Sequence, residues 1–257
     1  MELISSRQNN HVKHLVKLHE STRERRKARQ TLLEGIHLVQ SWCQAGAALQ
    51  WLIAAESALS HPEIAPLWQQ RVDRHLLLAD GLFGQLFDIQ PAVGIVAVIA
   101  IPLPAIQPAR TVLLLDDVQD PLNVGGILRT AAAAGVEQVY LSKHCADAWS
   151  PRVLRGAMGG HLVLTIHEQA DLMQTARQFD GQVVATSLED SQSLYETDLT
   201  GSVAWILGNE GAGISADLQA TATTRIRIPM PGAVESLNVA AAAAVCLFEQ
   251  ARQRSLA

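Results

Sequence analysis

The sequence predicts two α/β domains joined by a proline-rich linker, the second of them a doubly wound, mostly parallel sheet. Short apolar runs alternate with helical patterns along the chain, and such alternation is typical of a parallel sheet covered by helices. Residues 102–108 contain three prolines, too many for a helix or a central strand, so this stretch reads as an extended linker. Two late strands end in glycine- and proline-rich loops, which indicates a ligand crevice at the carboxyl edge of the sheet.

Composition and charge restrict the class of protein. The chain has 257 residues, 48% of them hydrophobic and 18% charged, which is typical of a globular protein with a sizeable core. It contains no apolar run of about 18 residues and no secretory signal pattern, so we expect a cytoplasmic protein without a membrane segment. Cys43, Cys145 and Cys246 are far apart and lack metal-ligand spacing. We therefore expect reduced thiols and no metal site.

Positive charge is concentrated at the N-terminus. Residues 1–30 hold eight Lys and Arg against three Glu, although the whole chain has a formal net charge of −5. A solvated helix face would explain this run. Contact with RNA phosphates is the alternative, because clustered cations attract nucleic acid without regard to its sequence. The candidate RNA-binding residues are Arg23, Arg25, Arg26, Lys27 and Arg29.

The first domain is predicted to comprise residues 1–101, with the linker over 102–110. Hydrophobic periodicity predicts, in order, helices over 11–19 and 32–43, a strand over 51–54, a helix over 62–70, a strand over 75–79, a helix over 82–87 and a strand over 94–101. This domain contains no recognisable catalytic constellation.

The second domain is predicted to comprise residues 111–257. Its pattern predicts strands over 111–115, 138–141, 162–166, 182–186, 203–207 and 224–228, with helices over 127–134, 151–158 and 170–179 and an alanine-rich helix at the end. A loop over 119–126 is expected to lead into the first of these helices, which Gly135 should end. Ser236 is expected to cap the final helix.

The loop that contains Asn123 and the loop over residues 208–213 can each be explained in another way when taken alone. Asn123 could cap a helix while Arg129 points to solvent, and residues 208–213 could be a nucleotide-binding glycine loop. The dinucleotide fingerprint, however, requires G-x-G-x-x-G after the first strand of a βαβ unit, and a P-loop requires Gly-Lys-Ser/Thr. Here the order is G-x-x-G-x-G late in the domain. Dinucleotide binding and P-loop hydrolysis are both disfavoured.

Three ordered motifs together are far more specific. They are DPLNVGGILRTA (residues 120–131), LGNEGAG (207–213) and IPMPGAVESLNV (228–239). In order and spacing they resemble the motifs of the SpoU/TrmH family of RNA 2′-O-ribose methyltransferases, which belong to the SPOUT class. The resemblance covers residues 111–254. The first domain is similar, more weakly, to the L30e/L7Ae-like substrate-binding module that many family members carry.

The resemblance implies an α/β SPOUT-type sheet with a C-terminal trefoil knot, a homodimer, and S-adenosylmethionine as methyl donor. Carried over by position, it implies cofactor contacts at Thr186, Leu207, Gly208, Ile228, Met230, Leu237 and Asn238. It implies catalytic roles for Asn123, Arg129, Glu210, Ser236 and Asn238. The acceptor would be a ribose 2′-hydroxyl of RNA, with rRNA favoured over tRNA because of the additional N-terminal domain.

The resemblance also points to Arg129 as the group that handles the 2′-hydroxyl proton. A guanidinium stays protonated in proteins, so we expect Arg129 to bind phosphate and stabilise the developing alkoxide instead. Two alternatives stay open. One is an RNA-binding or ribosome-assembly protein that has lost catalysis, and the other is a SPOUT enzyme that methylates a base nitrogen.

Overall fold

The computed structural model describes residues 2–105, 107–187 and 190–256, and the chain folds into two compact units. One unit comprises Met1–Leu103 together with Trp149–Leu162, and the other comprises Pro104–Ala148 and Val163–Ala257. Ile106 of the predicted linker lies outside the described residues. The segment Trp149–Leu162, which the sequence assigned to the second domain, packs with the first unit.

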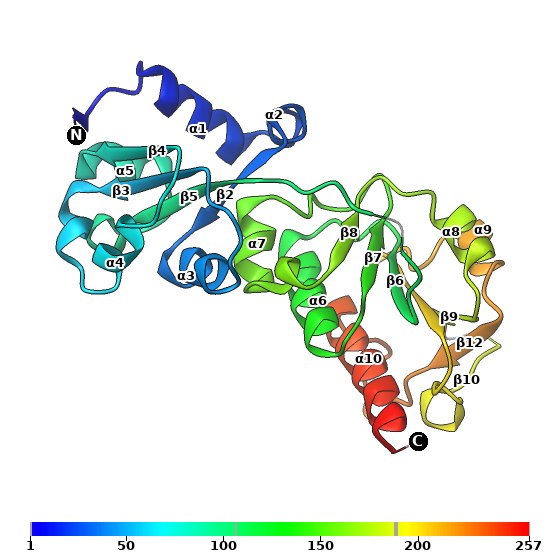
Figure 1. Cartoon of the computed structure of the whole chain (residues 1–257). Coiled ribbons are helices and arrows are strands. Elements are labelled where there is room, and N and C mark those ends of the chain that lie inside the picture. Colours follow the sequence, from blue (N-terminus) through cyan, green and yellow to red (C-terminus); the bar gives the residue numbers. More distant parts are fainter. Residues whose placement is uncertain (1, 106, 188–189, 257) are drawn as a thin grey trace. The chain divides into compact units, whose positions relative to one another are not determined.

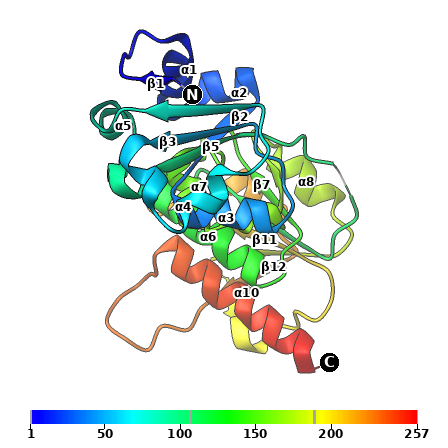
Figure 2. The same cartoon turned by 60° about the vertical axis from the view of Figure 1, so that its left-hand side comes forward.

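The first unit is a five-stranded sheet with helices on both faces (Figure 1). The strand order is β1-β4-β3-β5-β2, and β5 is antiparallel to both of its neighbours. Figures 1 and 2 both place α1 on one side of the sheet and α3 and α4 on the other. The elements are β1 (Leu3–Ile4), α1 (Asn10–Glu20), α2 (Thr22–Ala28), β2 (Gln30–Glu34), α3 (Ile36–Gln44), β3 (Trp51–Ala55), α4 (Ile64–Trp68), β4 (Arg74–Leu78), α5 (Asp80–Leu86), β5 (Ile95–Ala100) and α7 (Pro151–Ala157), with 3₁₀ turns at Glu56–Ser60, Pro91–Val93 and Gly160–Leu162.

The prediction of one helix over residues 32–43 is wrong. Leu32 and Leu33 are fully buried in strand β2, which pairs with β5 through the register Leu32↔Val98. Gly35 then adopts a φ of +94°, a conformation that ends the strand and that side chains rarely allow. Pairing with a strand more than sixty residues away outweighed the local helical periodicity.

Two polar contacts hold the segment Trp149–Leu162 within the first unit. The Thr31 hydroxyl donates a 2.5 Å hydrogen bond to the carbonyl of Trp149. Glu34, whose side chain is fully buried, forms a 2.6 Å ion pair with Arg155 and lies 3.0 Å from His19 Nε2. A buried carboxylate requires such partners, because an unpaired charge in the interior is costly.

The second unit is a seven-stranded sheet in which every described pair of strands is parallel. The strand order is β10-β12-β9-β11-β6-β7-β8. This confirms the predicted parallel α/β fold. The elements are β6 (Thr111–Leu115), α6 (Pro121–Ala133), β7 (Gln138–Leu141), β8 (Thr165–His167), α8 (Leu172–Gln178), β9 (Gln182–Thr186), β10 (Gln192–Ser193), β11 (Val203–Leu207), α9 (Ala216–Gln219), β12 (Thr224–Arg227) and α10 (Val239–Leu256), with a 3₁₀ turn at Leu194–Glu196.

Both faces of this sheet are covered, which explains why its central strands read as continuous apolar runs. On one face, alternate residues of β6, β9 and β11 pack against α8 and α9 in a single buried cluster. On the other face lie α6 and α10, which run side by side in Figures 1 and 2. Trp205, fully buried, donates a 2.7 Å hydrogen bond from Nε1 to Gln250 of α10. A Cβ at Gly126 would lie 3.5 Å from that of Ala240, so small residues allow the two helices to approach closely.

Helix α6 begins six residues earlier than predicted. Asp120 accepts a 2.9 Å hydrogen bond from the amide of Leu122, and Pro121 occupies the first helical position. The expected loop over 119–126 is therefore mostly the first two turns of the helix, and Asp120 rather than Asn123 is its cap. The helix ends at Ala133 and Gly135 follows with a φ of +78°. The trefoil knot that the family resemblance implies stays a prediction.

Within the described part of the chain, no helix is both long and apolar enough to cross a membrane.

Candidate active site

A cavity of about 530 Å³ opens at the carboxyl ends of three strands of the second unit. Its walls come from the residues that follow β9, β11 and β12 and from the first turns of α10. The two strands whose loops indicated this crevice, β11 and β12, are separated by β9, which brings Thr186 and Ser187 into the wall. Eight residues predicted for the site line this cavity: Thr186, Leu207, Gly208, Glu210, Ile228, Met230, Ser236 and Leu237.

The glycine loop after β11 is closed by its own hydrogen bonds. Asn209 and Gly213 exchange two backbone hydrogen bonds of 2.9 Å, and the Asn209 side-chain oxygen accepts two more from Gly211 and Ala212. The Asn209 amide donates to the carbonyl of Asp117, which ties this loop to the one after β6. A Cβ at Gly208 would lie 2.3 Å from the backbone of Gly213. Only glycine fits this position in the observed loop conformation.

Three residues from the three separate motifs form one hydrogen-bonded chain beside the cavity. Asn238 donates from Nδ2 to Asn123 Oδ1 at 2.9 Å. Asn123 in turn donates from Nδ2 to Glu210 Oε1. Because both asparagines use their amide groups as donors, the carboxylate of Glu210 is held in one orientation at the end of the chain. Its side chain also lines the cavity.

Asn238 has a second role, which corrects the prediction for Ser236. The Asn238 side-chain oxygen accepts hydrogen bonds from the amides of Ala240 (2.9 Å) and Ala241 (3.3 Å) at the start of α10. Asn238 is thus the cap of α10, and Ser236 is an exposed residue of the preceding loop. One side chain positions both the helix and the polar chain.

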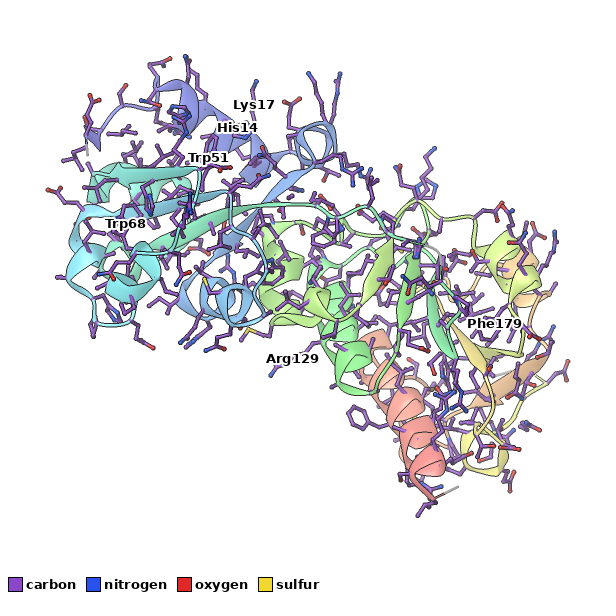
Figure 3. The ribbon with its side chains drawn as sticks, viewed as in Figure 1. His14, Lys17, Trp51, Trp68, Arg129 and Phe179 are labelled. Carbon is purple, nitrogen blue, oxygen red and sulfur yellow. The ribbon has the colours of Figure 1, made fainter. Side chains whose placement is uncertain are left out.

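Arg129 is not part of this cluster. It lies on α6, six residues after Asn123, which at 100° per residue turns it about 120° around the helix and moves it about 9 Å along the axis. Its side chain is exposed and lies outside the cavity lining, and Figure 3 shows it projecting away from α6. Within this chain Arg129 therefore lies apart from Asn123, Glu210 and Asn238.

The charge on the cavity wall is mainly negative. Among the described residues that line it, the charged side chains are Glu210, Glu235 and Arg227. Arg227 donates to the carbonyl of Ser191, whereas Glu235 has no hydrogen bond or ion pair with another described residue. Two carboxylates and an apolar wall complement a ligand that is both cationic and apolar. No group of three or more His, Cys, Asp or Glu that could hold a metal ion occurs among the described residues.

Several lining residues were missed by sequence reasoning. Ser187 and Gln219 are joined by a 3.0 Å hydrogen bond, and both face the cavity. Ser187 follows β9 directly, so the ending of that strand was a usable signal. Gln219 lies in the short helix α9, and nothing in the sequence indicated that this helix returns to the cavity.

The basic N-terminal run forms α2, and one of its five candidate residues is buried. Arg25 is 4% exposed and donates from Nη1 to the carbonyls of Leu18 (2.7 Å) and His19 (3.1 Å). Its guanidinium fastens the end of α1, so Arg25 was wrongly predicted to contact phosphate. The other four candidates are exposed: Arg23, Arg26, Lys27 and Arg29.

Two family models match this chain, one in its N-terminal part and one in its C-terminal part. Residues 110–248 match the family model described as the SpoU rRNA methylase family, and residues 9–81 match the MRM3-like substrate binding domain. A tRNA/rRNA methyltransferase of Synechocystis, itself uncharacterised, is 35% identical over 98% of this chain and 94% of its own length. The Bacillus subtilis 23S rRNA guanosine 2′-O-methyltransferase RlmP is 33% identical over 96% of this chain and 98% of its own.

Similar proteins also occur among the solved structures. An S-adenosylmethionine-bound rRNA methyltransferase from Sinorhizobium meliloti superimposes with a TM-score of 0.82 at 27% identity, covering 98% of this chain and 97% of that one. The similarity extends over both units of the chain.

Proposed function

The chain belongs to the SpoU rRNA methylase family, and from that premise we propose that it transfers a methyl group from S-adenosylmethionine to a ribose 2′-hydroxyl of ribosomal RNA. The observation that carries this proposal is the chain Asn238–Asn123–Glu210, which joins three motifs at the mouth of one cavity. Guanosine is the nucleoside favoured, because RlmP is named for a guanosine.

The cavity suits S-adenosylmethionine in size, polarity and charge. Cavities of this volume hold ligands of that size, and the two wall carboxylates complement a sulfonium and an ammonium group. We assign the adenine to the apolar residues Ile228, Met230 and Leu237. The loop at Gly208 and the neighbouring Thr186 and Leu207 would offer backbone groups for hydrogen bonding. The bound cofactor supplies an electrophilic methyl on a positively charged leaving group.

The protein contributes alignment and charge around the acceptor ribose. Methyl transfer would join the 2′-oxygen to the methyl carbon while the carbon–sulfur bond breaks, and the 2′-hydroxyl proton would pass to the carboxylate of Glu210. Asn123 would hold that carboxylate toward the hydroxyl, and the exposed Ser236 would orient the sugar. Holding the two reactants in line supplies most of the acceleration in this type of transfer.

Arg129 completes the site from a second subunit in this proposal. It shares one stripe of α6 with Leu122, seven residues earlier, which is 70% exposed, and Phe248 on the neighbouring α10 is 51% exposed. Exposed apolar side chains of this size are typical of an interface. A homodimer through this face would bury them and bring Arg129 to the partner's acceptor site, where a guanidinium can bind phosphate and the developing alkoxide.

The remaining parts of the proposal concern RNA. We assign residues 1–101 to substrate binding, 102–110 to the linker and 111–257 to catalysis. Arg23, Arg26, Lys27 and Arg29 would attract the RNA backbone. We place this enzyme in the cytoplasm, where it would meet ribosomal RNA.

The competing function is RNA binding without catalysis. Transfer of tritiated methyl from S-adenosylmethionine to unmodified ribosomal RNA distinguishes the two, with the Asn238→Ala variant as the inactive control. Incorporation above that control supports the enzyme. If calorimetry shows bound cofactor and no label reaches naked RNA or ribosomal precursor particles, the binding-only function is favoured.

A further inference from the structure

One edge of the first unit carries a cluster of aromatic and cationic side chains that the proposed catalytic site does not use. Strands β3 and β4 both begin there, with Trp51 and Arg74 paired in register. The guanidinium carbon of Arg74 lies 5.4 Å from the centre of the Trp51 ring. Helix α1 adds His11 and His14, whose rings lie 5.5 and 5.3 Å from that of Trp51. Figure 3 shows His14 and Trp51 together beneath α1, with Lys17 nearby.

Hydrogen bonds connect the histidines of this cluster to uncharged glutamines and to Arg74. His14 Nε2 lies 2.8 Å from Gln30 Oε1, and Gln30 donates a 2.6 Å hydrogen bond to Gln50. Arg74 lies 2.7 Å from His11 Nε2. Since arginine can only donate, that nitrogen of His11 is the acceptor. Burial, and next the Arg74 charge, lowers the pKa of His11. These hydrogen bonds link the members of the cluster within the chain.

Its positive charge is not neutralised by the protein. Lys13, Lys17 and Arg74 are all exposed, and none forms an ion pair with a carboxylate among the described residues. A structural cluster would ordinarily pair such cations with carboxylates. Here Arg74 lies over a partly exposed aromatic ring, and the adjoining helix α1 carries two further exposed lysines. A combination of cations with an aromatic ring is typical of surfaces that bind single-stranded nucleic acid.

We propose that this edge is a contact site for single-stranded RNA, formed by Lys13, Lys17 and Arg74 for phosphates and by the Trp51–His11 rings for a base. The proposal rests on the proposed function, because it assigns where the substrate of the methyl transfer is held. The edge runs from β4 through β3 and β5 to β2, which is three strand spacings or about 14 Å. This length is enough for a short stretch of extended single-stranded RNA. Unpaired bases can stack on such rings, whereas the bases of a duplex are already stacked.

The test compares charge variants by fluorescence anisotropy with a labelled 15-nucleotide oligouridylate and with the same strand in a duplex. Lys13→Gln/Lys17→Gln and Arg74→Gln each remove exposed charge from the edge, and Arg177→Gln removes an exposed charge on α8 as the matched control. We expect about a tenfold loss of single-strand affinity in the lysine pair. We also expect its salt dependence to fall by about 0.7 per lost phosphate contact.

The aromatic part is tested by Trp51→Phe, which should keep most of the affinity, against Trp51→Leu, which should lose about tenfold. Folding is checked by thermal denaturation, and the lysine pair, which has no side-chain partners to lose, keeps the test valid if a Trp51 variant unfolds. Single-strand affinity and salt slope equal to those of Arg177→Gln would overturn the proposal, as would tighter binding of the duplex. If the wild-type protein binds the oligonucleotide at this edge but transfers no methyl group, the proposed function fails while the contact site stands.

Discussion

Asn238 and Asn123 are 115 residues apart in the chain, yet Asn238 Nδ2 donates a 2.9 Å hydrogen bond to Asn123 Oδ1. The same Asn238 caps α10 through its side-chain oxygen. The start of α10, the first turn of α6 and the loop that carries Glu210 are therefore fixed relative to one another.

Replacement of Asn238 separates its two roles. Asn238→Asp keeps an oxygen that can cap α10 but removes the donor to Asn123, so we expect near-normal stability with methyl transfer reduced at least tenfold. Asn238→Ala removes both groups and should also cost about 1 kcal/mol of unfolding free energy through the lost cap. Chemical denaturation and a transfer assay on both variants check this. Full activity in Asn238→Asp would show that the hydrogen bond from Asn238 to Asn123 is not needed for methyl transfer.

Gly208→Ala should destroy the cofactor site. The added Cβ would lie 2.3 Å from the backbone of Gly213, so the loop must open and its carbonyl and amide groups must move. We expect S-adenosylmethionine affinity, measured by calorimetry, to fall more than tenfold. Gly211→Ala is the matched control, because its Cβ would meet only the Asn209 side-chain oxygen at 3.5 Å. Equal affinities in the two variants would contradict the proposed role of this loop.

Arg129→Ala should abolish methyl transfer while leaving S-adenosylmethionine affinity within a few-fold. The reason is that Arg129 lies outside the cavity and is assigned to the RNA phosphate and the alkoxide. A transfer assay measures the activity of the variant, and calorimetry measures its affinity for S-adenosylmethionine. Loss of cofactor binding in a folded Arg129→Ala protein would show that the residue acts on the cofactor site instead.

Mixing two inactive variants tests whether Arg129 acts across subunits. In a fully exchanged 1:1 mixture of Arg129→Ala and Asn238→Ala, half of the dimers are mixed and each has one intact site, so about a quarter of wild-type activity should return. If Arg129 served its own chain, no dimer would have an intact site. A mixture that stays inactive after verified subunit exchange would therefore rule out action in trans.

The sequence predicted the parts of this structure that depend on local patterns. Strand 111–115 and strand 203–207 were predicted with their observed bounds, because both are short apolar runs buried on two faces. Leu32 and Leu33 were misassigned because a distant strand, β5, decides their conformation. The start of α6 was missed because Asp120 and Pro121 were taken as part of a loop, although they form a capped first turn.

The candidate site was predicted in composition but not in arrangement. Motif order identified Asn123, Glu210 and Asn238, and their hydrogen bonds depend on tertiary packing that no local pattern encodes. Arg29 and Arg25 look equivalent in the sequence, yet one is exposed and the other fastens α1. Burial of a single arginine in a basic run depends on which carbonyls the fold leaves without a donor.

The central claim is the chemistry of transfer, and the most direct measurement is the identity of the methylated nucleoside. Ribosomal RNA lacking the modification is incubated with the protein and S-adenosylmethionine, digested to nucleosides and analysed by mass spectrometry. The account predicts a nucleoside, guanosine by our proposal, in which the added methyl group stays with the ribose on fragmentation. A methyl group that stays with the base would contradict the account, and so would unmethylated RNA from a protein that binds both cofactor and substrate.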